Sequence, residues 1–321
     1  MKPLVKDPAR IRIGIIGMTE GNGHPYSWSA IFNRYDRESM TTECPFPGIP
    51  AYLNKEDYDS MGIPGANITM VCCDRKKDAE HVSRLSNIPQ VVECPEDMIG
   101  KVDAVIIATD IGNEHVRRAL PFLNAGMPLF IDKPLCDNIQ DLCFFREAVA
   151  NGAHLISSSS MRYAKEYQPW HNGRYHEIGE LRFISMTMSK KWETYGIHAL
   201  EAIYPITGPG FESIRNTGCE KRNIVHLKHK KGFDVVICNT YDMFYNPVIT
   251  LTGTAGSITL RSQDSYAAFR GQLVAFVDYL RTGIAPVSFA ETDELMQLVI
   301  GGILSRENKG TEISLPLTGK I

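Results

Sequence analysis

A glycine-rich segment follows the first strongly apolar run of the chain. Residues 11–18 read IRIGIIGM, and Gly17, Gly21 and Gly23 come within the next few positions. Backbone N–H groups at a strand-to-helix turn can hold a pyrophosphate when no side chain obstructs it. The segment therefore predicts a dinucleotide site, with these candidate contacts: Gly17, Met18, Thr19, Gly21, Gly23 and His24. The spacing differs from GxGxxG, so an ordinary glycine-containing turn stays open as the alternative.

An acidic residue ends the next apolar run, ITMVCCD. Asp74 stands where a carboxylate would accept hydrogen bonds from the ribose hydroxyls of an adenosine. Arg75 begins a basic triplet, residues 75–77, which could bind the 2′-phosphate of NADP or simply be a solvated charge run. The expected cofactor is NAD or NADP, and Asp74 favours NAD.

The distance between these two signals is too long. The acid usually follows the glycines by about 20 residues, whereas here 74 − 23 = 51. The surplus lies within residues 24–66, which contain HPYSW and CPFPGIP. This insertion could fold over the cofactor edge, with His24, Tyr26 and Trp28 lining the site. Surface decoration or a subunit interface is the alternative.

The elements that must position these residues alternate in type. Apolar runs at residues 11–18, 68–73, 102–108 and 129–131 predict strands buried on both faces, with helices between them. Such alternation predicts a parallel sheet. One helix is expected up to Ala125 with a stop at Gly126, and another from a cap at Asp137 to Gly152, followed by the strand HLISSSS.

The pattern changes after residue 181. Successive β-rich runs separated by turn residues predict antiparallel strands, with a hairpin turn at Gly232. Two amphipathic helices follow, the second starting at a capping box of Ser288 and Glu291. The expected fold is an α/β Rossmann domain over residues 1–134, followed by an α+β domain over residues 135–321. The second domain is built on a large, open, mainly antiparallel sheet and serves substrate binding and oligomerisation.

Ordered motifs along nearly the whole chain resemble the Gfo/Idh/MocA family of glucose-fructose oxidoreductases and inositol dehydrogenases. The motifs are Ala108-Thr109-Asp110, His115, Asp132-Lys133-Pro134, Arg162-Tyr163, the strand GELRFI, the helix GIHALE and the hairpin GTAGSITL. The resemblance implies an NAD(P)-dependent oxidoreductase of a sugar, polyol or related carbohydrate derivative. It also implies that residues of the first three of these motifs, Ala108, Thr109, Asp110, His115, Asp132 and Lys133, contribute to cofactor binding.

The same resemblance implies the catalytic residues. The family uses the lysine of its KP motif and a DxGxH motif, which correspond here to Lys133 and His198. Oxidising an alcohol needs a base for the hydroxyl proton, which a neutral imidazole provides, and a cation such as Lys133 to polarise the reacting oxygen. Arg162 and Tyr163 are further substrate-binding candidates, although a structural salt bridge would equally explain Arg162.

One position departs from the family pattern. The motif aspartate is Thr194 in this chain, so Glu193 or Tyr195 is expected to compensate, or Glu201 to orient His198 from one helical turn away. The departure keeps two alternatives open. One is an NAD-dependent, redox-neutral glycosidase-type enzyme, and the other is a non-catalytic NAD(P)-binding regulatory protein.

Composition excludes other classes of partner. The net charge is −3, so there is no basic field for nucleic acid or an anionic membrane. The eight cysteines have no zinc-type spacing, and the separation of His171 and His176 does not suit a metal site, so no metal is expected. No signal or membrane segment is recognised, which predicts a cytoplasmic protein. The open sheet predicts a homodimer or homotetramer.

Overall fold

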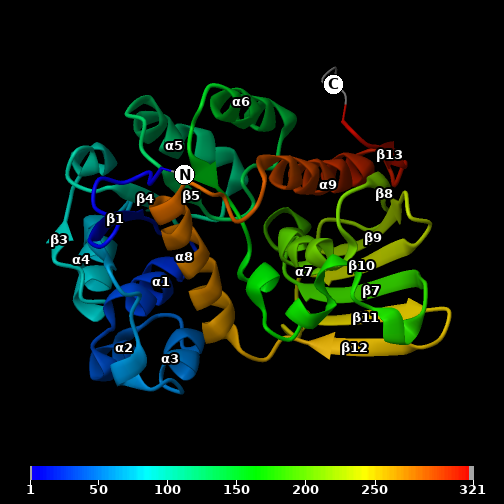
Figure 1. The fold of residues 1–321 in the computed structure, drawn as a ribbon, viewed down its shortest axis with the longest axis horizontal. Helices are drawn as coiled ribbons and strands as arrows, with labels where there is room; N and C mark the ends of the chain where they lie inside the picture. Colours follow the sequence, from blue (N-terminus) through cyan, green and yellow to red (C-terminus); the bar gives the residue numbers. More distant parts are fainter. Residues whose placement is uncertain (1, 318–321) are drawn as a thin grey trace. The chain divides into compact units, whose positions relative to one another are not determined.

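The computed structural model describes residues 2–317, which form two compact units (Figure 1). Unit 1 contains residues up to Asp132 together with 144–157 and 269–287, and unit 2 contains the remaining segments. The chain first passes from unit 1 to unit 2 after Asp132, two residues before the expected boundary at Pro134. The two returns to unit 1 were not part of the expected contiguous division. They occur because residues 155–156 complete the first sheet and because Phe276 packs on Phe130 of that sheet.

Unit 1 is built on a parallel six-stranded sheet in the order β3-β2-β1-β4-β5-β6. Its strands are β1 (Ile11–Ile16), β2 (Ala66–Cys72), β3 (Gln90–Val91), β4 (Ala104–Ile107), β5 (Leu129–Ile131) and β6 (Leu155–Ile156). All four residues of β4 are buried, as expected for an inner strand covered on both faces. The predicted Rossmann-type sheet is confirmed, although β3 was not predicted and β6 is shorter than HLISSSS.

Helices follow the strands in the expected alternation. They are α1 (His24–Asn33), α2 (Arg37–Glu43), α3 (Gly48–Leu53), α4 (Lys76–Leu85), α5 (His115–Asn124), most of α6 (Ile139–Ala150) and α8 (Ser265–Thr282) from Phe269 onward. Short turns are η1 (Tyr58–Ser60), η2 (Pro95–Met98) and η3 (Gly112–Glu114). Gly126 takes a φ of 67° just after α5, as its predicted stop requires. The surplus between Gly23 and Asp74 is therefore α2, α3 and η1, inserted after the crossover helix α1.

Unit 2 is built on a seven-stranded sheet in the order β12-β11-β7-β10-β9-β8-β13. The strands are β7 (Leu181–Ser189), β8 (Phe211–Asn216), β9 (Arg222–His229), β10 (Asp234–Thr240), β11 (Val248–Gly253), β12 (Ser257–Arg261) and β13 (Ile313–Ser314). The mainly antiparallel character is confirmed, with one exception: β10 pairs parallel to β7. Gly232 has a φ of 80° in the β9–β10 hairpin, as predicted.

Two helices cover one face of this second sheet, α7 (Ile197–Thr207) and α9 (Phe289–Glu307) (Figure 1). The π-helical turn η7 (Trp192–Gly196) leads into α7, and the short turns η4 (Ser160–Tyr163), η5 (Gln168–Gly173) and η6 (His176–Ile178) precede β7. The predicted cap of α9 is confirmed, since the Ser288 side chain accepts a hydrogen bond from the Glu291 backbone N–H. None of the helices in residues 2–317 is both long enough and apolar enough to span a membrane.

Candidate functional site

The three glycines of the first loop have three different surroundings. A Cβ added to Gly17 would lie 2.4 Å from Pro25, and one added to Gly23 would lie 2.6 Å from Ile49 and 2.7 Å from the Phe46 ring. These two glycines allow the first turn of α1 and the inserted segment to pack against the loop. Gly21 has a φ of 79° and no atom within 4 Å of its added Cβ. It is therefore the glycine whose backbone a ligand can approach closely, next to the N-terminus of α1.

The loop is tied to the carboxyl ends of two strands. The Asn22 amide donates to the Ala108 carbonyl at 3.0 Å and to the Asp132 carboxylate at 3.3 Å. Nδ1 of His24 lies 2.7 Å from the same carboxylate, which is fully buried. The Thr19 hydroxyl donates to Asp110 at 2.8 Å. Because ligands of open α/β sheets bind at this edge, the network holds the loop where a dinucleotide is expected.

Asp74 stands at the end of β2, as predicted, and it is paired with Arg118. Both carboxylate oxygens accept hydrogen bonds from the guanidinium at 2.8 Å, and Arg118 also binds Glu114. Hydrogen bonding from Arg118 lowers the pKa of Asp74. A carboxylate has about four acceptor positions, so the ionised Asp74 can still accept from a ribose hydroxyl. Sequence reasoning missed Arg118, although its spacing of four from Glu114 was a helical ion-pair signal.

Most of the basic triplet is neutralised by acids. Arg75 donates to Asp78 at 2.6 and 3.0 Å, and Lys76 donates to Glu93 at 2.7 Å. Arg75, which was predicted to bind the 2′-phosphate of NADP, is thus already paired with the Asp78 carboxylate. The arrangement favours NAD over NADP, in agreement with the position of Asp74.

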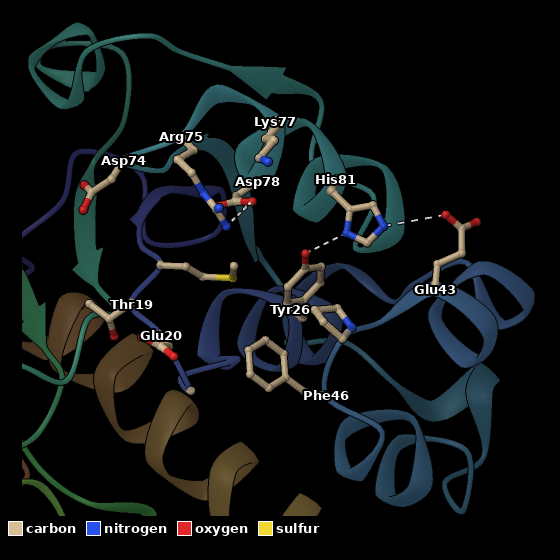
Figure 2. A pocket seen from close by; sticks show the side chains of 13 residues that line it. Thr19, Glu20, Tyr26, Glu43, Phe46, Asp74, Arg75, Lys77, Asp78 and His81 are labelled. Carbon is tan, nitrogen blue, oxygen red and sulfur yellow. Dashed lines mark hydrogen bonds and ion pairs between the residues drawn. The ribbon is translucent and has the colours of Figure 1, made fainter.

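A pocket of about 760 Å³ adjoins Asp74 (Figure 2). It is lined by the predicted residues Met18, Thr19, Gly21, Asp74 and Arg75, together with Glu20, Tyr26, Glu43, Pro45, Phe46, Lys77, Asp78 and His81. Glu43, Pro45 and Phe46 belong to the inserted segment. Between the two interpretations of residues 24–66, this lining supports folding over the cofactor edge. A smaller pocket of about 290 Å³ also includes Asp74 and is lined by Cys73, Pro95, Arg117, Arg118 and Pro121 among others.

The floor of the larger pocket is a chain of polar contacts. Burial raises the pKa of Tyr26, and its hydroxyl forms a 2.6 Å hydrogen bond with Nδ1 of His81. Nε2 of His81 lies 3.6 Å from Glu43, and Arg84 binds both oxygens of that glutamate. Figure 2 shows this connection between α1, α4 and the end of α2. The third aromatic candidate, Trp28, is fully buried against His24 and Phe130 and does not line the pocket.

His115 has a different position from that expected of a cofactor contact. Its ring is fully buried at the start of α5, and Nε2 lies 2.9 Å from the carbonyl oxygen of Thr109. This bond shapes the turn of residues 108–110 that follows β4. Because the ring has no exposed surface, an indirect role fits it better than direct contact.

In unit 2, Tyr195 brings the two implied catalytic residues together. Nζ of Lys133 lies 5.8 Å from the centre of the Tyr195 ring, and the His198 ring lies edge-on at 4.7 Å. Lys133 is only 2% exposed. The Tyr195 hydroxyl accepts a hydrogen bond from Lys190 at 2.6 Å. Tyr195 thus has an imidazole, which can act as an acid or base, and a buried ammonium on its ring, and such a pair can assist a reaction at a hydroxyl group.

The partner of the His198 ring is not one of those predicted. The Ser159 hydroxyl lies 2.6 Å from Nδ1, whereas Glu201 binds the Ser159 backbone N–H and the Arg162 guanidinium. Glu193 pairs with Arg306, and Thr194 is half-buried in η7. Through its own contacts Glu201 lies next to Ser159, the residue that contacts the His198 ring. Ser159 is 39 residues from His198 in sequence, and no local pattern pointed to the pair.

Arg162 lies in a largely buried ion-pair network. It binds Glu201 and, at 3.1 Å, Glu291. Burial raises the pKa of Glu201, and the charge of Arg162 opposes that effect. Nη2 of Arg162 is buried with no hydrogen-bond partner in residues 2–317. Salt bridges thus engage two nitrogens of Arg162, Nε and Nη1, whereas Nη2 has no partner among the described residues.

The histidines considered for a metal site lie in η5 and η6. Within the part of the chain that the structure describes, no three His, Cys, Asp or Glu side chains form a group that could hold a metal ion.

Comparison with known proteins agrees with the two-unit fold. Residues 11–153 match the model of the Gfo/Idh/MocA oxidoreductase family, described by its NAD-binding Rossmann fold. Over 103 residues the chain is 36% identical to an inositol 2-dehydrogenase of Rhodococcus erythropolis (strain PR4 / NBRC 100887), a match covering 31% of this chain and 30% of that protein. The chain thus spans under a third of that curated relative.

Solved structures extend the fold likeness to nearly the whole chain. One is a myo-inositol dehydrogenase of Lactobacillus casei in complex with NAD(H) and myo-inositol, with a TM-score of 0.75 at 14% identity, covering 97% of this chain and 98% of that one. Another is a probable dehydrogenase of Thermotoga maritima, with a TM-score of 0.73 at 16% identity, covering 95% and 99%. At these identities the likeness establishes the fold.

Proposed function

We propose that this chain, whose residues 11–153 match the model of the Gfo/Idh/MocA oxidoreductase family with its NAD-binding Rossmann fold, oxidises or reduces a carbohydrate-like substrate. The substrate class is a sugar, a polyol such as a cyclitol, or a related derivative. His198 is the acid/base residue and Lys133 polarises the reacting oxygen. The names of the inositol dehydrogenases among its relatives support this class.

The observation that carries the proposal is the convergence of Lys133 and His198 on Tyr195. Lys133 is only 2% exposed, and a buried ammonium is costly unless polar or charged groups compensate it, which makes such a position selective for a purpose-built site. Its charge beside a substrate hydroxyl lowers the pKa of that hydroxyl and makes loss of its proton easier. His198 then accepts the proton in the oxidation direction and returns it in reduction.

Unit 1 has the residues that would hold the cofactor. Gly21 and the start of α1 suit the pyrophosphate, Asp74 suits the ribose hydroxyls, and the smaller pocket beside Asp74 suits the flat adenine ring. Asp110, Asp132 and His24 would fix the shape of the loop through the bonds described above. When bound, NAD accepts the hydride that leaves the substrate carbon.

Ser159 sets the tautomer of His198 in this proposal. The Ser159 oxygen already accepts the Met161 backbone N–H at 3.1 Å and can accept the Nδ1 proton of His198 as well. That tautomer carries its lone pair on Nε2, the atom that takes the substrate proton. Glu201 and Arg162 hold Ser159 in place through the Ser159 backbone N–H. Arg162 and Tyr163 would contact other substrate hydroxyls, with Nη2 of Arg162 as a donor.

Calorimetric titration with NAD⁺ and NADH tests the cofactor half of the proposal, and a panel of polyols and sugars with absorbance detection of NADH tests the chemistry. We expect binding of both nucleotides and NADH formation with at least one cyclic polyol or sugar. Release of an aglycone without accumulation of NADH would favour the redox-neutral glycosidase alternative. Binding without any turnover would favour a regulatory protein.

We also propose that the exposed face of the second sheet mediates a homodimer or homotetramer. Phe183 of β7 and Ile224 of β9 are exposed large side chains on strands whose alternate residues are buried. Light scattering that gives a monomer at micromolar concentration would contradict this. A cytoplasmic location is proposed because all eight cysteines are free thiols.

A further inference from the structure

The larger pocket beside Asp74 carries more acid than base. Four carboxylates line it, Glu20, Glu43, Asp74 and Asp78, against three basic side chains, Arg75, Lys77 and His81. Two of these acids, Glu43 and Asp78, lie outside the glycine loop and the strand end at Asp74 that predicted the cofactor site. Glu43 belongs to the inserted segment, and Asp78 lies in the first turn of α4.

Each arginine near the ribose position is occupied by one of these acids. Arg118 forms two bonds of 2.8 Å with Asp74, and Arg75 forms bonds of 2.6 and 3.0 Å with Asp78. The Asp78 side chain is 17% exposed, whereas that of Arg75 is 64% exposed. Asp78 is therefore the less exposed partner, and it binds the Arg75 guanidinium within the pocket lining.

The inserted segment adds to the same effect. Glu43 is bound by Arg84, and His81 lies 3.6 Å from it, so these two side chains hold the partly exposed carboxylate at the pocket lining. Nδ1 of His81 is in turn engaged by the Tyr26 hydroxyl at 2.6 Å. Lys77 is the one basic side chain of the lining for which the described residues provide no ion pair.

We propose that Asp78 acts with Asp74 as a determinant of selectivity for NAD over NADP, by binding the arginine that a 2′-phosphate would require. This inference rests on the proposed function, because it assumes that Asp74 receives the adenosine ribose. In Rossmann folds a nearby arginine accommodates the 2′-phosphate, since a guanidinium binds phosphate through two parallel bonds. Here a phosphate on that ribose meets Asp74 and Asp78 with Arg75 already paired. The negative charges of the two carboxylates and of the 2′-phosphate repel one another, which opposes NADP binding.

The test is the dissociation constants of NAD⁺ and NADP⁺, measured by calorimetry on the full chain for the wild type and two variants. Asp78→Asn removes the carboxylate that holds Arg75. Glu80→Gln removes one acid from the exposed face of the same helix, outside the pocket lining, and controls for net charge. We expect wild-type NADP⁺ binding to be weaker than NAD⁺ binding by about tenfold to a hundredfold, the range of one hydrogen bond to a charged group.

Asp78→Asn should tighten NADP⁺ binding by about tenfold and leave NAD⁺ binding within about threefold, while Glu80→Gln changes neither. Adding Arg75→Gln to Asp78→Asn should abolish the gain. A gain in affinity cannot result from misfolding, so the variant is informative even when less stable. Equal wild-type affinities for the two nucleotides, or equal effects of the two single variants, would overturn the inference while leaving NAD binding intact. A wild type that binds neither nucleotide would overturn the proposed function itself.

Discussion

The Ser159 hydroxyl oxygen lies 2.6 Å from Nδ1 of His198. Related motifs place an aspartate four residues before this histidine, and here that position is Thr194. A serine from another segment therefore holds the ring through a neutral hydrogen bond. A neutral partner fixes the tautomer but adds no charge to stabilise an imidazolium.

Ser159→Ala should lower kcat of the proposed reaction by about tenfold, because the imidazole loses its preferred tautomer while its position on α7 is kept. KM for NAD should stay unchanged. Ser160→Ala removes the neighbouring buried serine hydroxyl and serves as the matched control. Steady-state kinetics with the substrate found by the panel provides the comparison. A similar loss of kcat in both variants would point to a general effect on the η4 turn.

Lys133→Met should lower kcat by about a hundredfold or more, since general acid–base assistance contributes about 10² to 10⁴ in rate. The side-chain volume is nearly conserved, so the packing around residue 133 should be kept, and calorimetry with NAD⁺ shows whether the variant is folded and binds the cofactor. Kinetics and calorimetry on the same sample separate the two effects. Unchanged kcat in a folded, NAD-binding variant would remove Lys133 from the mechanism.

The alternation of elements was predictable because buried parallel strands and amphipathic helices leave clear patterns. The strands at residues 104–107 and 129–131 and the cap at Ser288 are examples. The parallel pairing of β10 with β7 was not predictable, because strand patterns report burial and not the neighbour. The returns of residues 144–157 and 269–287 to unit 1 likewise depend on tertiary packing.

Gly23→Ala should destabilise the chain by about 1–3 kcal/mol, the usual cost of overpacking. The new methyl group would lie 2.6 Å from Ile49 and 2.7 Å from Phe46. Gly48→Ala is the matched control, because nothing lies within 4 Å of its added Cβ at the start of α3. Thermal unfolding of the two variants measures the difference. Equal melting temperatures would show that the insertion does not pack on the loop.

His171 predicts a pH dependence of stability. Burial, with help from Arg162 and Arg174, lowers its pKa from 6.5 to about 4. The unfolded chain therefore binds a proton that the folded chain does not between about pH 6.5 and 4. This contribution is fully present above pH 6.5 and is lost as the pH falls through that window, at up to about 1.4 kcal/mol per pH unit. His171→Gln should flatten the slope in urea unfolding from pH 7 to 4, and an unchanged slope would contradict the assignment.

The chemistry was less predictable from sequence than the fold. The DKP and GIHALE motifs identified Lys133 and His198, but their common neighbour Tyr195 and the partner Ser159 depend on how η4, η7 and α7 pack. Arg118 and Asp78 were missed because their effect is on other side chains, Asp74 and Arg75. The glycine loop was unusual in sequence because Gly23 also makes room for Ile49 and Phe46 of the inserted segment.

In the proposed function, a hydride passes from the substrate carbon to NAD and His198 accepts the hydroxyl proton. The most direct measurement is single-turnover NADH formation by stopped-flow absorbance, with NAD⁺-saturated wild type and His198→Gln mixed with the best polyol or sugar of the panel. We expect NADH formation in the wild type, and in His198→Gln a rate of NADH formation that is lower by about a hundredfold or more at equal NAD⁺ affinity. Equal rates in the two proteins, or wild type that binds NAD⁺ but never forms NADH, would contradict it.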